Sequence, residues 1–362
     1  MSYSINRKNI ATLVSVVIPA FNAEQTIART IESACAQTHH NLEIIVVDDG
    51  STDNTLAVAD ACAASDRRIK VIRSSNNGVA AARNLGIKMS HGSFIAPLDA
   101  DDLWHPTKIE KQLAVFSNGG EAIGFVYTPF REIDQRDEIL WSSGFSDIQG
   151  HAYLRSLLLN FVGNGSALLL RREAVSDVGA YELSFHQNGL QGTEDRFLQT
   201  EIARNWQVGV VPEYLTGYRV YPGRMSSDLV KMAKSHFYLY DLIKEKYPET
   251  PKKFLSFARG ITHARLGVIY LRQGNLLSGS QHIAFSICES PLATASQLVK
   301  SMKNLGKKIG FVKDDFYGEN KTKKKFKDID PKYNINFKVG FPESVVIYMA
   351  KNQELSFLSK NK

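Results

Sequence analysis

The sequence has few cysteines, and no two of them lie close together. Cys35, Cys62 and Cys288 are the only three in 362 residues. This odd number, without the short spacings of a metal cluster, gives no sign of a disulfide framework. Chains with so little cysteine are typical of reducing compartments, so the cytoplasm is the expected location.

The sequence also lacks apolar stretches that would carry it into or across a membrane. No uninterrupted apolar run has transmembrane length. The first ten residues are polar and have no apolar core of a secretory signal. Hydrophobic residues make up 43% of the chain and charged residues 22%, which is ordinary for a soluble globular protein of one large domain or two smaller ones.

An excess of charge is confined to one segment. Residues 300–327 contain ten lysines, three acidic residues and no arginine, which matches the formal net charge of +7 of the whole chain. Nucleic-acid binding is not expected, because the segment has no interleaved aromatic stacking platform. A peripheral contact with a membrane surface and a solubilising linker are both consistent with this composition.

Three common signatures of nucleotide and nucleophile sites are missing. The first apolar run, residues 13–18, is followed by Pro19-Ala20-Phe21-Asn22 and not by a G-x-G-x-x-G turn. Neither a G-x-x-x-x-G-K-[ST] loop nor a G-x-S-x-G elbow occurs. These absences argue against a dinucleotide-dependent dehydrogenase, a P-loop hydrolase and a hydrolase with a nucleophile elbow.

The chain does show short apolar runs that alternate with helical stretches. Strands are expected at residues 13–18, 42–47, 70–73, 94–98 and 123–127, and helices at 23–37, 52–64 and 79–90. This alternation predicts a parallel α/β sheet. Residues 128–162 are expected to be irregular. Three further helices are expected at residues 229–247, 251–272 and 276–288.

Two of the expected strands end in acidic clusters. Asp48-Asp49 follows residues 42–47, and Asp99-Ala100-Asp101-Asp102 follows residues 94–98. Because ligands bind at the carboxyl ends of parallel strands, both clusters should face one crevice. Crowded carboxylates need a cation, and their oxygens suit Mg²⁺ or Mn²⁺, which would also bind a phosphate. Taken alone, the second cluster is equally consistent with a solvated acidic turn.

Four segments in the same order carry a resemblance to a known family. They are residues 16–22, 43–53, 77–86 and 98–102, and they resemble the family 2 glycosyltransferases, inverting enzymes of the GT-A fold. The resemblance covers roughly residues 13–226 and implies an α/β, Rossmann-like sandwich. We therefore expect an N-terminal tail (1–12), a GT-A domain (13–227), a helical extension (228–299) and a Lys-rich C-terminal segment (300–362).

The resemblance implies roles in binding a nucleotide-diphosphate donor. Asp49 would contact the base, Phe21 would line the base pocket next to Pro19, and Arg83 would lie near the diphosphate. Asp99 would contact the ribose or sugar and share with Asp101 the binding of Mn²⁺ or Mg²⁺. Asp102 would be supporting or structural. Arg219 and Ser226 would cover the diphosphate, although Arg224 is an alternative to Arg219.

A direct displacement also needs a base that takes a proton from the acceptor hydroxyl. Thr193-Glu194-Asp195-Arg196 resembles the E-D motif of the family, which implies Asp195 as the base and Glu194 in support. The same two acids could instead cap the helix expected at residues 196–205. The upstream motifs favour the catalytic interpretation.

The expected function is an inverting, metal-dependent transfer of a sugar to a hydroxyl of a glycan or lipid-linked acceptor. By analogy, this belongs to bacterial cell-surface polysaccharide biosynthesis at the cytoplasmic face of a membrane, with UDP as the commonest carrier in the family. Two alternatives are a sugar-phosphate nucleotidyltransferase and a non-catalytic scaffold that binds a nucleotide sugar. The first would need a Gly-rich basic loop after the first strand, where Pro19-Ala20-Phe21-Asn22 stands instead. The second would not need Asp99, Asp101 and Asp195 together.

Overall fold

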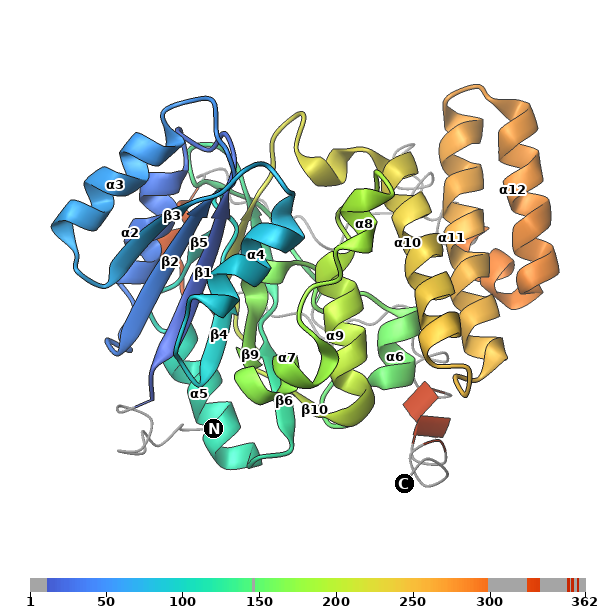
Figure 1. The fold of residues 1–362 in the computed structure, drawn as a ribbon. Helices are drawn as coiled ribbons and strands as arrows, with labels where there is room; N and C mark the ends of the chain where they lie inside the picture. Colours follow the sequence, from blue (N-terminus) through green and yellow to red (C-terminus); the bar gives the residue numbers. More distant parts are fainter. Residues whose placement is uncertain are drawn as a thin grey trace.

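A seven-stranded sheet forms the centre of the computed structural model, which describes residues 12–144, 147–298 and 324–332, with residues 350, 351, 353, 354 and 357. The strand order is β10-β6-β9-β4-β1-β2-β3 (Figure 1). The strands are β1 (Val14–Ala20), β2 (Leu42–Asp48), β3 (Ile69–Arg73), β4 (Phe94–Pro97), β6 (Ile123–Tyr127), β9 (Leu168–Arg171) and β10 (Gln207–Val210). Only β9 runs antiparallel to its two neighbours.

Helices cover both faces of this sheet. They are α2 (Ile27–Cys35), α3 (Thr55–Ser65) and α5 (Lys108–Gly119) on one face, and α4 (Val79–Lys88), α7 (Arg172–Val178) and α9 (Glu194–Asn205) on the other. All seven residues of β1 are buried; Val16 packs in the core that contains α2 and α5, whereas Val17 packs in the core that contains α4 and α9. Because both faces are covered, the central strands β1, β2 and β4 are buried throughout and mostly apolar, which made them visible in the sequence.

A second sheet of four strands lies within residues 103–219. Its order is β5-β11-β7-β8, with β5 (Leu103–Trp104), β11 (Thr216–Arg219), β7 (Phe130–Ile133) and β8 (Ile139–Ser142). The expectation that residues 128–162 are irregular is therefore wrong, since they contain β7, β8 and the short helix α6 (Tyr153–Leu158). The pattern was hidden because β7 buries a charged residue: Arg131 is 2% exposed and its guanidinium lies 4.8 Å from the Tyr214 ring centroid.

Residues 324–332 return to this small sheet. The Ile139 N–H donates to the Lys324 carbonyl at 3.0 Å, and the Tyr214 N–H donates to the Pro331 carbonyl at 2.9 Å. Phe326, in the 3₁₀ helix η3 (Phe326–Asp328), is 2% exposed and packs with Leu103 and Ile133. Residues 300–323 of the Lys-rich segment and residues 1–11 of the expected tail lie outside the described residues.

The helical extension is present, and its helices match the expected ranges within one residue at each end. They are α10 (Leu229–Lys246), α11 (Lys252–Arg272) and α12 (Leu276–Glu289). Leu239 and Ile243 of α10 share a hydrophobic core with Leu154 of α6 and Phe197 of α9, so α10 packs directly on the sheet-containing part. Within the described ranges, no helix is both long and apolar enough to cross a membrane.

A buried ion pair attaches a residue near the C-terminus to this helical core. The Glu354 carboxylate is 2% exposed and accepts hydrogen bonds from Arg155 Nε at 2.8 Å and from the Leu154 N–H at 2.7 Å. Removing one partner of a buried pair strands the other charge, so Glu354→Ala should lower the free energy of unfolding by about 3–5 kcal/mol. Urea unfolding measures this loss.

The matched control for Glu354 is Glu249, which pairs with Arg204 at 2.5 Å where about a quarter to a third of each side chain is exposed. Glu249→Ala should cost less than about 1 kcal/mol, as is usual for pairs near the surface. Equal losses in the two variants would contradict a stabilising role for the buried contact of residue 354.

Candidate active site

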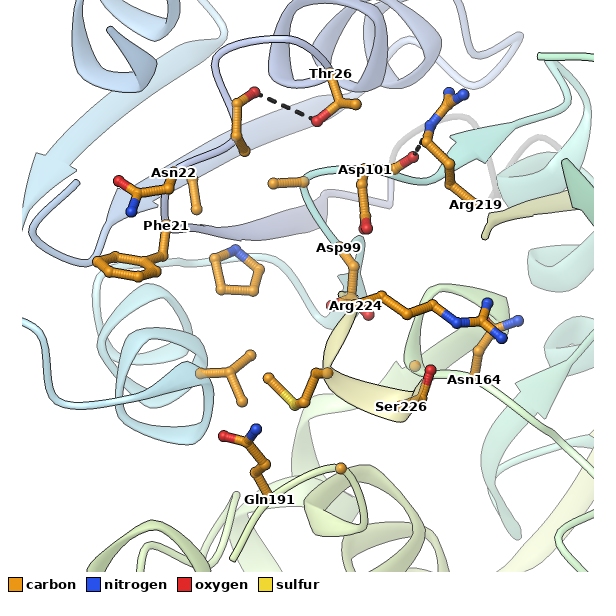
Figure 2. Close-up of a pocket in the computed structure, with 18 of the residues that line it drawn as sticks. Phe21, Asn22, Thr26, Asp99, Asp101, Asn164, Gln191, Arg219, Arg224 and Ser226 are labelled. Carbon is orange, nitrogen blue, oxygen red and sulfur yellow. Dashed lines mark hydrogen bonds between the residues drawn. The ribbon is translucent and has the colours of Figure 1, made fainter. Parts of the chain in front are cut away.

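A cavity of about 950 Å³ opens at the carboxyl ends of β1, β2 and β4. Figure 2 shows residues that line it. The lining contains every site residue expected from the sequence: Pro19, Phe21, Asp49, Arg83, Asp99, Asp101, Glu194, Asp195, Arg219 and Ser226. Residues from the two ends of the GT-A region, far apart in the sequence, therefore meet in one place.

Asp49 connects the end of β2 to the start of α4. Its Oδ1 accepts a hydrogen bond from the Asn77 N–H at 3.1 Å, and its Oδ2 accepts one from the Gly78 N–H at 2.9 Å. Gly78 has a φ of +88°, and a Cβ there would lie only 2.6 Å from Nδ1 of His186. Glycine is therefore required at position 78, and Asp49 fixes the turn against the pocket.

Asp102 is a structural residue. It is fully buried, its Oδ2 accepts from the Ser166 hydroxyl at 2.6 Å, and its Oδ1 accepts from the Arg219 N–H at 2.9 Å. Burial, with the nearby charges of Asp101 and Asp99, raises its pKa. The side chain of Asp102 thus joins β11 to the strand end that carries the other two acids, and it does not line the cavity.

Asp99 and Asp101 suit a divalent cation that also binds a phosphate. Their carboxylates point toward the same part of the pocket (Figure 2), and burial together with the charge of Asp99 raises the pKa of Asp101. This is the behaviour of neighbouring carboxylates without a compensating cation. The described residues contain no cluster of three or more His, Cys, Asp or Glu placed to hold a metal. One or two carboxylates suffice where phosphate oxygens and water complete the coordination.

Arg83 lies between Asp99, one of the two carboxylates expected to bind a metal ion, and Asp195, the expected base. Its side chain is 5% exposed, its Nη2 is 2.5 Å from Asp99 Oδ1, and its guanidinium lies 5.1 Å from the Tyr181 ring centroid. Burial lowers the pKa of Arg83, but the charge of Asp99 and the other acids outweighs this and raises it. A Cβ on Gly165 would lie 3.4 Å from Arg83 Nη2 and 3.8 Å from Asp195 Oδ2, so both side chains flank this glycine.

Asp195 and Glu194 form the first turn of α9 and differ in their surroundings. Glu194 is 3% exposed and accepts from the Gly192 N–H at 2.7 Å, so it fixes the loop that leads into the helix. Asp195 Oδ1 accepts from the Arg196 N–H at 2.7 Å, while its Oδ2 has no hydrogen-bond partner among the described residues. Burial raises the pKa of Asp195 to about 6, although Arg83 lowers it. A carboxylate of this kind can act as a general base near neutral pH.

The guanidinium of Arg219 is occupied by the protein itself. Its Nε donates to the Asp101 carbonyl at 2.6 Å, its Nη2 contacts Asp137 Oδ1 at 2.6 Å, and its Nη1 donates to the Asp134 carbonyl. Arg219 therefore fixes the turn between β7 and β8. Arg224 lies 5.2 Å from the Tyr218 ring centroid, and its Nη1 has no partner in the described part of the chain. The geometry favours Arg224 over Arg219 for contact with an anionic ligand.

Several lining residues were missed by the sequence analysis. Tyr221 donates a hydrogen bond to Asp101, and Asn164, Gln191 and Met232 line the same cavity as Asp195. All four depend on contacts between segments that are distant in the sequence, and none of them has a local pattern.

Comparison with known proteins identifies the family of the N-terminal part of the chain. Residues 15–179 match the model of glycosyl transferase family 2. These residues are a family 2 glycosyltransferase domain. An uncharacterized glycosyltransferase of Rickettsia felis is 42% identical over 136 residues, which cover 37% of this chain and 22% of that protein.

A second relative has a more specific name. The UDP-Glc:α-D-GlcNAc-diphosphoundecaprenol β-1,3-glucosyltransferase WfaP of Escherichia coli is 41% identical over 119 residues, covering 33% of this chain and 46% of that protein. The chain thus spans less than half the length of these two relatives.

The family 2 domain has the GT-A fold expected from the sequence. The mannosyltransferase of Pyrobaculum calidifontis, solved with GDP-Man and Mn²⁺, superposes with a TM-score of 0.55 at 17% sequence identity. The superposition covers 81% of this chain and 80% of the other. At this identity the match establishes the fold alone.

Proposed function

We propose that this chain is an inverting glycosyltransferase that moves a sugar from a nucleotide-diphosphate donor to a hydroxyl of a glycan or lipid-linked acceptor. The proposal rests on one observation: the carboxylates of Asp99 and Asp101 and the half-buried acid Asp195 line the same cavity, with Arg83 paired to Asp99. A UDP-sugar donor and a diphosphate-lipid acceptor are supported by the name of the Escherichia coli relative. A lipid-linked acceptor would bring the enzyme to the cytoplasmic face of a membrane, where the lysines of residues 300–327 would contact anionic lipid.

The reaction follows from where the acids lie. Asp195 Oδ2 accepts the proton of the acceptor hydroxyl, and the hydroxyl oxygen attacks the anomeric carbon of the donor. The bond from that carbon to the diphosphate oxygen breaks, and a single displacement inverts the configuration. Asp99 and Asp101 would hold Mn²⁺ or Mg²⁺, which when bound neutralises charge on the departing diphosphate.

Other residues bind and orient the donor. Arg224 and Ser226 would contact the diphosphate, and Phe21, which is 48% exposed at the rim, would cover the base beside Pro19 and Asp49. Arg83 holds Asp99 in position and keeps a positive charge next to Asp195. Its Nη2 is paired with Asp99, whereas its buried Nε has no hydrogen-bond partner among the described residues. Arg83 would therefore orient Asp99 and also stabilise negative charge on the diphosphate.

The proposal is tested by calorimetric titration of the chain with UDP, GDP and dTDP, each with Mn²⁺ and with a chelator. We expect one nucleotide to bind only in the presence of the metal. The corresponding nucleotide sugars should then be consumed in the presence of glycoside acceptors, with release of the same nucleotide. If none of the three nucleotides binds with or without metal, the proposed donor site is wrong.

The rate of transfer should depend on the protonation of Asp195. Because the base works only as the carboxylate and its pKa is raised to about 6, kcat/KM for the acceptor should be half-maximal near pH 6, fall below it and level off above pH 7. Steady-state rates between pH 4.5 and 8.5 at saturating donor measure this. Donor binding over the same range is measured as the control, because the pKa of Asp101 is also raised to about 6. A flat profile of kcat/KM between pH 5 and 7 would contradict the role of Asp195.

A further inference from the structure

One face of α10 holds the segment that leads into the catalytic acids. Phe185, at 0% exposure in α8 (Ser184–Gln187), packs with its ring centroid 5.2 Å from that of Tyr238. The Asn188 side-chain amide donates to the Tyr238 hydroxyl at 3.1 Å. Figure 1 shows α8 and α10 side by side. The helical extension therefore contacts the chain just before Glu194.

Ser235 holds the backbone of Gln191 from both sides. The Gln191 N–H donates to Ser235 Oγ at 3.1 Å, and the Ser235 hydroxyl donates to the Gln191 carbonyl at 3.0 Å. Ser235 is fully buried, so water cannot replace these bonds without opening the contact between α10 and this segment. The side chain of Gln191 is directed at the cavity (Figure 2).

Met232, one turn before Ser235, fixes the next residue. Gly192 has a φ of +87°, and a Cβ there would lie 2.5 Å from Met232 Sδ. The Gly192 N–H donates to Glu194 Oε2 at 2.7 Å, so a single short stretch connects α10 to the first turn of α9. Met232 itself lines the cavity together with Gln191, Gly192 and Asp195.

The side chains that this segment and α10 add to the lining are uncharged. Gln191 supplies an amide and Met232 supplies an apolar thioether. The cation beside Asp195 is Arg83, and its Nη2 is paired with Asp99. Amides donate to and accept from sugar hydroxyls, and neither Gln191 nor Met232 offers a positive charge to an anionic group. The segment leads directly into Asp195, where the attacking hydroxyl must be.

We propose that the helical extension completes the acceptor subsite. Gln191 and Met232 contact an uncharged sugar unit whose hydroxyl faces Asp195, and Ser235 is a positioning residue that holds Gln191 in place. This inference rests on the proposed function and assigns its acceptor class: the unit that receives the new bond is a neutral sugar, and α10 supplies part of its binding site.

The test compares wild type, Gln191→Ala and Ser235→Ala with a nucleotide sugar as donor and with two matched probes, p-nitrophenyl glucoside and p-nitrophenyl glucuronide, as acceptors. Loss of a hydrogen bond to substrate predicts that the KM for the glucoside rises about tenfold or more in both variants. The KM for the donor should stay within about twofold, and the glucuronide should be the poorer acceptor of wild type. Ser235→Thr, which keeps the hydroxyl, should restore the acceptor KM.

Ser286→Ala is the matched control, because Ser286 is a fully buried serine of the same extension whose hydroxyl donates to the Gly260 carbonyl at 2.7 Å. It should lower stability and leave both KM values unchanged. The inference is overturned if Ser235→Ala raises the donor KM as much as the acceptor KM, or if the glucuronide is preferred. If wild type fails to bind any nucleotide sugar, the proposed function is overturned instead, and this inference with it.

Discussion

Replacing Asp195 by asparagine should reduce sugar transfer about 10²–10⁴-fold and leave donor binding intact. The asparagine amide has nearly the same shape as the carboxylate but cannot take the proton of the acceptor hydroxyl. Asp195 Oδ2 lies beside Arg83 and Gly165, whereas Asp99 and Asp101 follow β4. Removing the base should therefore change kcat and not the affinity for the donor. Steady-state kinetics and calorimetry with Mn²⁺ measure the two quantities separately.

Glu194→Gln is the control for this substitution. Glu194 differs from Asp195 in being 3% exposed and bonded to the Gly192 N–H, and glutamine can still accept that hydrogen bond through its amide oxygen. We expect a loss of less than about tenfold in kcat, because an intact hydrogen bond preserves the geometry of the turn. Near-normal turnover by Asp195→Asn would remove Asp195 from the mechanism, and equal losses in both variants would indicate a structural role for the whole turn.

The parts of the fold that the sequence predicted are those with local signals. β1, β2 and β4 are buried on both faces and are mostly apolar, so their positions and the acids that follow β2 and β4 could be found directly. The small sheet had no such signal. β7 alternates buried and half-buried residues and includes the buried cation Arg131, whose partners, Tyr214 and the Asp330 carbonyl, lie far along the chain.

In the candidate site, too, the sequence identified the residues but not the partners that they contact. The sequence predicted that Arg83 and Arg219 would be cations of the donor pocket, and both line it. The sequence could not show that Arg83 pairs with Asp99, or that Arg219 binds the turn at residues 134–137. An arginine has five N–H donors, and its function depends on how many the protein uses. In Arg219 all three guanidinium nitrogens are used, whereas Arg83 Nε and Arg224 Nη1 have no partner in the described part of the chain, so Arg83 and Arg224 are the candidates for the diphosphate.

Replacing Asp101 by asparagine should remove the metal dependence of donor binding. Asp101 is half-buried, and its carboxylate lies near that of Asp99. A divalent cation bound by one or two carboxylates depends strongly on each of them. The affinity for the nucleotide in the presence of Mn²⁺ should fall at least about 10–100-fold, since even partners outside the coordination shell contribute that much. Calorimetry with Mn²⁺ and with chelator should then give the same weak binding.

Asp102→Asn is the contrasting variant, because Asp102 is the next residue but binds the Ser166 hydroxyl and the Arg219 N–H and does not line the cavity. An asparagine can keep only part of these bonds, so this variant should lose stability and retain metal-dependent donor binding. If Asp102→Asn also abolished the effect of Mn²⁺, or if Asp101→Asn kept it, the metal would have to be placed elsewhere. Because Asp99 is already paired with Arg83 at 2.5 Å, Asp101 is the better placed of the two carboxylates to bind the cation. Loss of the metal effect in Asp101→Asn, together with its retention in Asp102→Asn, would assign this role to Asp101.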